Sequence, residues 1–251
     1  MKIIKAFIVA FSMYSRIPMP RFNWESEDMK YHLIFFPWVG AVIGAMEYLL
    51  YYLYERYEFH SLVLAALAIA IPLIITGGFH LDGFMDMEDA LSSYQTREKR
   101  LEILKDPHIG AFSVINVITL GLLYFAMIML LTKKGFIIWC FSFFIARAIS
   151  GICVVRCKKA KEEGLLHTEA KTASDKVVFV ALLIELILAV LVSSYISPVY
   201  AISMVLFGIE NAYCSMKRAK RLLGGITGDV MGWYVVNAEL LMGIALVVIA
   251  V

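Results

Sequence analysis

Four acidic side chains lie within residues 82–89, at the end of a long apolar segment: Asp82, Asp86, Glu88 and Asp89. In a helix, Asp86 and Asp89 would lie within about 40° of Asp82 around the axis, so three carboxylates share one face while Glu88 points elsewhere. Like charges one turn apart destabilise a helix by roughly 0.2–0.5 kcal/mol per pair. A bound Mg²⁺ or Mn²⁺, which prefers oxygen ligands, would offset that repulsion. The spacing therefore predicts a metal site at Asp82, Asp86 and Asp89.

Basic residues follow this acidic face within the same polar segment, residues 78–110. They are Arg97, Lys99, Arg100 and Lys105, followed by Asp106. A metal ion with cations beside it suits a diphosphate group, because the metal bridges phosphate oxygens while Arg or Lys neutralises the charge that develops during transfer. The alternative is a solvated polar loop without a site.

A short surface helix is expected to carry these basic residues. Thr96 is a suitable N-cap, and Pro107 disfavours helical conformation in the residue before it. Residues 97–105 are therefore predicted to be helical, with Leu101 and Leu104 turned inward.

Two histidines flank the acidic segment, His80 before it and His108 after it. Either suits phosphate binding or general-base catalysis, because the imidazole changes charge near neutral pH. The alternative for both is a position in the polar headgroup zone of a membrane. The sequence does not choose between these interpretations.

A glycine-rich turn, residues 224–229, offers a second place for phosphate. Glycines permit positive φ and close backbone approach, so amides at Gly224 and Gly225 would cradle phosphate oxygens, with Thr227 and Asp229 as extra ligands. The turn is not a P-loop, since it lacks the Gly-Lys-Ser/Thr ending. A simple turn between two membrane helices is the alternative.

The composition places these residues on a membrane protein. The 251 residues are 61% hydrophobic and 18% charged, with a mean hydropathy of +0.78, which is too apolar for an ordinary soluble domain. We predict an all-α integral membrane protein, a single polytopic domain over residues 1–251. The predicted crossing segments are residues 33–54, 61–77, 111–132, 136–155, 177–196, 197–214 and 231–251. Residues 1–12 are predicted to form an interfacial or re-entrant helix.

The distribution of positive charge predicts the orientation. With the N-terminus inside, the cytosolic segments hold 19 of the 23 Lys and Arg residues, which fits the positive-inside rule for seven crossings of the cell (inner) membrane. Every long polar loop, and the site with them, then faces the cytosol. One such loop contains Lys158, Lys159 and Lys161, which suit either substrate or anionic lipid headgroups.

Ionisable and thiol side chains also lie inside the apolar segments. Arg147 in the middle of a crossing segment costs roughly 2.5–3.5 kcal/mol on insertion scales, so we expect it to be paired or to face a polar cavity. Its candidate partners are Glu47, Glu185, Glu210, Asn211, Asn237 and Glu239.

The four cysteines are expected to be buried small hydrophobic residues: Cys140, Cys153, Cys157 and Cys214. We expect no disulfides among them, and their positions do not match the spacing of zinc ligands.

Taken together, these residues resemble one family, the cobalamin 5'-phosphate synthases, also called adenosylcobinamide-GDP ribazoletransferases. The similarity runs through nearly the whole chain in order. Its most specific elements are residues 80–83, His-Leu-Asp-Gly, and residues 224–229, Gly-Gly-Ile-Thr-Gly-Asp. Further matching positions are 16–20, 36–40 with 44, 86, 89, 104–106, 109–112, 147, 163–164 and 239.

The resemblance implies that adenosylcobinamide-GDP is joined to α-ribazole or its 5'-phosphate, with Mg²⁺ and release of GMP. It implies Asp82, Asp86 and Asp89 as metal ligands, and Lys105, Asp106 and Asp229 as diphosphate or metal contacts. The predicted catalytic residues are His80, Lys105, Asp106 and His108, and the predicted substrate-binding residues are Arg16, Arg100, Arg147, Gly224, Gly225, Thr227 and Asp229. Beyond the substrates, we expect the lipid bilayer as a partner and no nucleic acid; a homo-oligomer is left open.

Two alternatives stand beside this hypothesis. A CDP-alcohol phosphotransferase would use the same chemistry with another leaving nucleotide, but its signature places Gly after the second aspartate, whereas here Gly83 follows the first. A cation transporter would use the intramembrane carboxylates Glu47, Glu185, Glu210 and Glu239. Transporters often show internal repeats and broken helices near the midplane, and neither is evident in this sequence.

Overall fold

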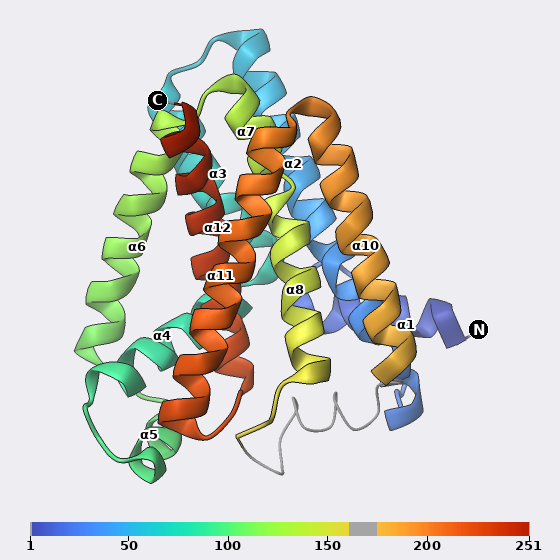
Figure 1. Cartoon of the computed structure of the whole chain (residues 1–251), viewed down its shortest axis with the longest axis vertical. Coiled ribbons are helices and arrows are strands. Elements are labelled where there is room, and N and C mark those ends of the chain that lie inside the picture. Colours follow the sequence, from blue (N-terminus) through green and yellow to red (C-terminus); the bar gives the residue numbers. More distant parts are fainter. Residues whose placement is uncertain (1, 161–174, 251) are drawn as a thin grey trace.

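The computed structural model describes residues 2–160 and 175–250, in which helices are joined by short loops and no strand occurs (Figure 1). This confirms the predicted all-α fold. The helices are α1 (Lys2–Tyr14), η1 (Ser26–Phe35), α2 (Phe36–Tyr57), α3 (Ser61–Thr76), α4 (Phe79–Ser92), α5 (Arg97–Ile103), α6 (Ala111–Leu130), α7 (Lys133–Trp139), α8 (Ser142–Arg156), α10 (Asp175–Ile196), α11 (Pro198–Leu223) and α12 (Gly228–Ala250).

Six of these helical segments are long and apolar enough to cross a membrane, as a multi-pass membrane protein requires. They are Glu27–Tyr57, Ala111–Leu130, Lys133–Arg156, Lys176–Ile196, Pro198–Leu223 and Gly228–Ala250. The shorter α3 and the polar α4 form a bent pair, and counting that pair as one crossing gives seven. The predicted segments therefore agree with the structure to within a few residues at most boundaries, although α11 continues to Leu223.

The corner between α3 and α4 turns the chain by 97°. It is built from Gly77 and Gly78, whose φ angles of 68° and 82° lie in the region that only glycine adopts readily. We take α3 as the crossing part of the pair and α4 as a helix lying along the end of the bundle, where Figure 1 shows it beside α5. The acidic segment therefore runs at a steep angle to α3.

The N-terminal helix α1 has the position expected of an interfacial helix. It lies beside the lower half of the bundle (Figure 1) and buries Phe11 and Tyr14 against residues of η1 and α2. Lys5 Nζ pairs with Asp28 at 3.0 Å and so ties α1 to η1. Figure 1 marks the C-terminus at the top of the bundle and the N-terminus at the side of its lower half.

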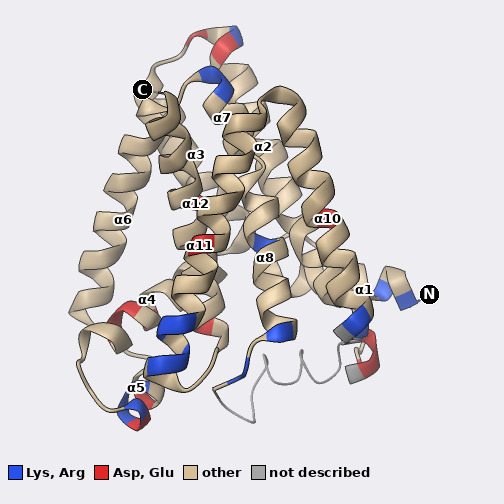
Figure 2. Ribbon diagram, viewed as in Figure 1, with Lys and Arg blue, Asp and Glu red and all other residues tan. Residues whose placement is uncertain are grey.

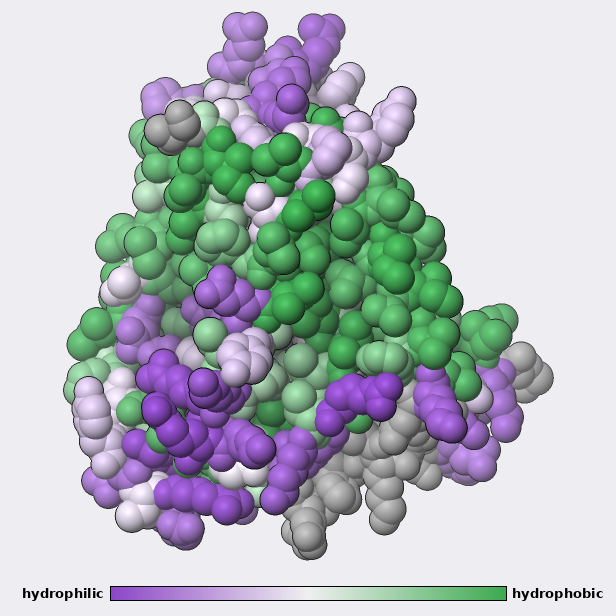
Figure 3. All heavy atoms as spheres, in the orientation of Figure 1, coloured by the Kyte–Doolittle hydropathy of each residue, from purple (hydrophilic) through white to green (hydrophobic). Residues whose placement is uncertain are grey.

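The most central helix is α12, which packs against α4, α6, α8 and α11. Its buried residues include Trp233, Tyr234 and Glu239. Charged residues gather at the lower end of the bundle, around α4, α5 and the C-terminal part of α11 (Figure 2), beneath a hydrophobic belt (Figure 3). We call this the basic end. Its cytosolic orientation stays a prediction.

The predictions for the start of α5, for Leu104 and for the cysteines are confirmed in part. The Thr96 side chain caps α5 by accepting from the Lys99 amide, and Leu104 is buried, as predicted. Cys140 and Cys153 are buried, but the same prediction is wrong for Cys214, which is exposed because it lies on the outer face of α11. Lys161, Glu163 and Gly164 lie outside the described residues.

Candidate active site

The acidic segment is helical as predicted, and α4 divides it into two faces. His80, Gly83, Phe84, Met87, Ala90 and Leu91 are buried. Asp82 is exposed, and Asp86 is half-buried. Amphipathic α4 thus turns its apolar residues toward the bundle while Asp82 and Asp86 lie at the basic end.

Helices α4 and α12 approach each other closely at two glycines. A Cβ atom on Gly83 would come within 2.9 Å of the Cα atom of Asp229, and one on Gly232 would come within 2.9 Å of the carbonyl oxygen of His80. Only hydrogen at these positions allows the backbones to come so near. The contact brings Asp229, the second residue of α12, to the acidic helix.

The pKa of Asp86 reflects its burial and the carboxylates close to it. Burial raises the pKa of Asp86 to about 6, and the charges of Asp82, Asp229 and Asp89 add to the shift. Carboxylate oxygens are the donors that Mg²⁺ prefers, so the chemistry of the donor set fits that ion. The side chains nevertheless stand apart, because no three His, Cys, Asp or Glu residues in the described ranges are grouped closely enough to hold a metal.

Asp89, the third predicted ligand, has a structural partner. Its carboxylate accepts hydrogen bonds from the backbone amides of Gly110, at 2.8 Å, and Ser113, at 2.9 Å. These amides belong to the start of α6, so Asp89 caps that helix from a neighbouring one. A carboxylate used in this way has less freedom to bind a metal. Asp229 is a further carboxylate close to Asp86.

The glycine-rich turn has an arginine against it. A Cβ atom on Gly224 would come within 2.3 Å of Cζ of Arg97, and the φ of Gly224 is 81°. Arg97 was one of the basic residues of the segment but not among the predicted site residues. Its contact with the turn joins positions far apart in the sequence, so no local pattern indicates it. Arg100 lies on the same helix, half-buried, with its Nε atom without a hydrogen-bond partner.

The remaining residues of the turn contact the segment after α8 and the start of α12. Ile226 donates its amide to the carbonyl of Lys158 and accepts from the amide of Ala160, both at 2.9 Å. A Cβ atom on Gly225 would come within 2.5 Å of the Lys158 carbonyl oxygen, so this glycine serves backbone packing. The hydroxyl of Thr227 donates to Asp229 at 3.2 Å and accepts from the amide of Val230, which helps to begin α12. Of the two glycines that begin the turn, Gly224 is therefore the one that packs against a cationic side chain.

The loop after α5 presents an Asp and His pair. His108 Nδ1 lies 2.6 Å from Asp106 Oδ1, and the His108 amide donates to the same oxygen at 3.0 Å. These bonds lower the pKa of the Asp106 carboxyl, the amide bond having the larger effect. Lys105 beside them is exposed, as are both members of the pair. Asp89 ties the loop to α4 through Gly110.

His80 and Arg147 lie in the interior instead. The His80 ring is buried against the rings of Phe36 and Phe79, at centroid distances of 5.6 and 5.3 Å, and Nδ1 has no partner. Arg147 pairs with Glu239 at 2.7 Å, which confirms that it finds an intramembrane partner. Both side chains line a cavity of about 130 Å³ among α3, α4, α6, α8 and α12.

Arg16, another predicted substrate contact, packs on the corner between α3 and α4. Its backbone amide donates to the Ile75 carbonyl at 2.7 Å, and its side chain lies where a Cβ atom on Gly77 would be. It is exposed at the basic end, but no contact with Asp82 or Asp86 is present among its hydrogen bonds and ion pairs.

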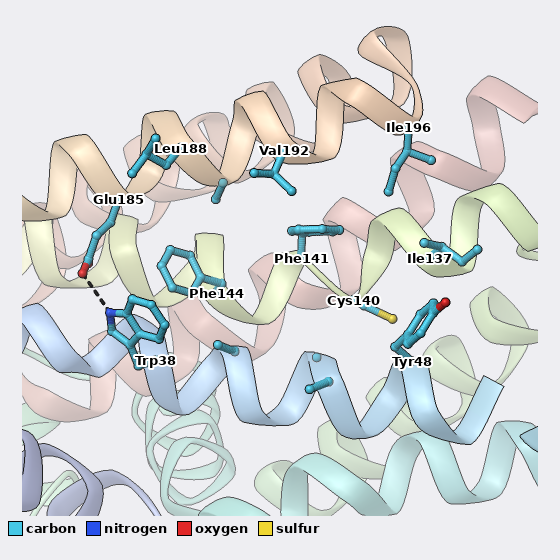
Figure 4. A pocket seen from close by; sticks show the side chains of 14 residues that line it. Trp38, Tyr48, Ile137, Cys140, Phe141, Phe144, Glu185, Leu188, Val192 and Ile196 are labelled. Atoms are coloured by element: carbon cyan, nitrogen blue, oxygen red, sulfur yellow. Dashed lines mark hydrogen bonds between the residues drawn. The ribbon is translucent and has the colours of Figure 1, made fainter. Parts of the chain in front are cut away.

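The four intramembrane carboxylates of the transporter alternative do not form one group. Figure 4 shows Glu185 at one end of an apolar cavity of about 570 Å³ between α2, α8 and α10, where it accepts from Trp38 Nε1 at 2.9 Å. Glu47 is buried with no hydrogen-bond partner, Glu239 pairs with Arg147, and Glu210 is exposed. This arrangement offers no chain of carboxylates through the bundle.

The whole chain is similar to known proteins. A family model described as cobalamin-5-phosphate synthase matches residues 6–247. The adenosylcobinamide-GDP ribazoletransferase of Lachnoclostridium phytofermentans is 41% identical over 248 residues, which cover 99% of this chain and 95% of that protein. The one from Clostridium perfringens strain 13 is 34% identical, with 96% and 98% covered, and the one from Geobacillus kaustophilus is 28% identical, with 93% and 91% covered. No solved structure matches the chain significantly.

Proposed function

The chain belongs to the cobalamin-5-phosphate synthase family and is an adenosylcobinamide-GDP ribazoletransferase, and we propose that it joins adenosylcobinamide-GDP to α-ribazole or α-ribazole 5'-phosphate. A ribazole hydroxyl attacks the phosphorus next to cobinamide. The new phosphorus–oxygen bond forms as the bond to GMP breaks, and the hydroxyl proton leaves with a base. GMP is the leaving group.

This proposal rests mainly on the close contact between Asp229 of α12 and the acidic helix α4. The close approach of Gly83 to Asp229 places three carboxylates, those of Asp82, Asp86 and Asp229, at the basic end of the bundle. We propose that these residues hold Mg²⁺, with Asp89 supporting them from the α6 cap. When bound, Mg²⁺ would neutralise charge on the diphosphate.

We assign a phosphate-binding cation and a base from α5 and the loop after it. Arg97, against the Gly224 turn, is placed to hold phosphate oxygens of the nucleotide, as guanidinium groups do. His108 is suited to take the hydroxyl proton on Nε2, because Asp106 engages its Nδ1 atom and fixes the ring. His80 is buried away from solvent, so we assign it to packing instead. The site faces the cytosol in this proposal, where GMP would be released.

The test is GMP release by the purified protein in lipid nanodiscs with Mg²⁺, adenosylcobinamide-GDP and α-ribazole 5'-phosphate. Asp82→Ala and Asp86→Ala should abolish turnover. Glu88→Gln is the matched control, because Glu88 accepts from Trp233 Nε1 at 2.7 Å and glutamine keeps an acceptor there. Turnover with CDP-linked lipid donors instead would favour the CDP-alcohol alternative, and wild-type protein inactive with both donors would refute the proposal.

A further inference from the structure

A cavity of about 770 Å³ lies between α8, α10 and α11, and none of its lining residues belongs to α4 or α5. Its walls are apolar and its lower rim is basic. The walls include Ile149, Ile152, Leu186, Ile209, Ala212 and Met216, and the rim carries Lys158, Lys217 and Lys220. The site described above uses none of these side chains.

Backbone pairing fixes the lower rim. The hydrogen bonds of Ile226 with the carbonyl of Lys158 and the amide of Ala160, both 2.9 Å long, join the end of α8 to the turn after α11. Gly225 and Ile226, on the other side of that junction, also line the cavity. Lys158, from one side of the junction, therefore lies on the same rim as the lysines of α11.

The three rim lysines have no acidic partner in the part of the chain that the structure describes. Among the residues that the structure describes, none of the three forms an ion pair, and Lys217 Nζ lies 5.6 Å from the centroid of the Tyr213 ring. Three cations around one cavity repel one another, and an anion at the rim would relieve that repulsion. The rim therefore matches a phosphate group.

The walls match an acyl chain. Ile209 is 48% exposed and Tyr213 is 65% exposed, and both lie on α11, a helix long enough to cross the membrane. Ile209 precedes Lys217 by eight residues, so an apolar wall of about 12 Å rises from the rim toward the middle of the bundle. Figure 3 shows the same change on this face, with hydrophobic residues above and hydrophilic ones below.

We propose that this cavity binds one anionic phospholipid, with its phosphate on the rim lysines and an acyl chain between α8, α10 and α11. A soluble phosphate compound would leave the apolar walls unused, whereas a phospholipid satisfies both parts. Basic pockets between membrane helices bind anionic headgroups for the same reason. This inference does not rest on the proposed function, because no residue of the α4 site takes part.

Native mass spectrometry tests the proposal. Protein from nanodiscs with equal amounts of phosphatidylglycerol and phosphatidylcholine is transferred to detergent, and the phospholipids retained per protein molecule are counted. Wild-type protein should retain one phosphatidylglycerol. Lys217→Gln/Lys220→Gln should weaken retention about thirtyfold, since a surface lysine contributes about fivefold, whereas Lys217→Arg/Lys220→Arg should keep it.

Two control variants distinguish lipid binding in the cavity from nonspecific attraction of lipid by positive charge. Lys2→Gln/Lys30→Gln removes the same charge from α1 and η1, away from the cavity, and should leave retention unchanged. Ala212→Phe keeps all three lysines but fills the apolar part, and should reduce retention. Equal retention of the two lipids by wild-type protein, or an equal loss of retention in the two Gln double variants, would overturn the proposal. Displacement of the lipid by GDP would also overturn it and would assign the lysines to a nucleotide.

Discussion

Gly83 and Asp229 are in backbone contact: a Cβ atom on Gly83 would lie 2.9 Å from the Asp229 Cα atom and 3.1 Å from its carbonyl oxygen. The neighbouring atoms are backbone, which cannot move aside as a flexible side chain can. This contact sets the distance between α4 and α12, and with it the spacing of the carboxylates that each helix contributes. The first prediction follows from it.

Gly83→Ala should push α4 away from α12 and lower turnover by roughly tenfold to a hundredfold, because small misplacements of catalytic groups have large effects on rate. Steady-state GMP release checks this. Gly121→Ala is the control, since nothing lies within 4 Å of a Cβ atom there, and its turnover should match that of the wild type. Wild-type activity in Gly83→Ala would show that the helix spacing is unimportant.

Asp89→Ala should reduce stability and spare metal affinity. The change removes the acceptor of the Gly110 and Ser113 amides, and loss of a helix cap costs about 1 kcal/mol. Thermal unfolding should therefore shift downward, while the Mg²⁺ concentration for half-maximal activity should change little. A large rise in that concentration with unchanged stability would instead make Asp89 a metal ligand, as the sequence predicts.

Asp86→Asn should stabilise the protein without Mg²⁺ at pH 7.5 and have little effect near pH 4. The raised pKa of Asp86, about 6, means that the folded state binds its proton more tightly than the unfolded state does. Stability is then lost as pH rises through about 6, and asparagine removes that loss. Unfolding curves in EDTA across this pH range measure it, and a variant less stable at pH 7.5 would contradict it.

Glu239→Gln should destabilise the protein by about 3–5 kcal/mol, because it leaves Arg147 buried without a counter-charge. The double variant Arg147→Met/Glu239→Gln should recover much of the loss. Glu102→Gln breaks an exposed pair with Lys99 and should cost under about 1 kcal/mol. Unfolding of all three in one detergent allows the comparison, and similar losses from the buried and exposed changes would be contrary to expectation.

His108→Ala should lower turnover and alter its dependence on pH if His108 is the general base, whereas His80→Ala should mainly lower stability. The difference follows from exposure, since His108 is open to solvent and His80 is 5% exposed. Turnover measured per folded molecule separates the two effects. Loss of turnover in folded His80→Ala, with His108→Ala fully active, would reverse the assignments.

Several elements of the fold were predictable because they depend on local properties. Long apolar runs define the crossing helices, and Thr96 with its following residues defines the short helix α5. Periodicity alone placed Asp82 and Asp86 on one face of α4. Arg147 required a partner for reasons of charge, but six candidates were open, and only the packing of α8 against α12 selected Glu239.

The sequence by itself determined the family, the membrane fold and the kinds of side chain available at the basic end, because composition, spacing and motif are properties of the chain in order. The tertiary structure decided which of them meet. It placed Asp229 beside α4, Arg97 on Gly224, and Asp89 at the start of α6. Such contacts join residues distant in sequence, and they depend on how closely the helix backbones approach, which glycine positions such as Gly83 permit.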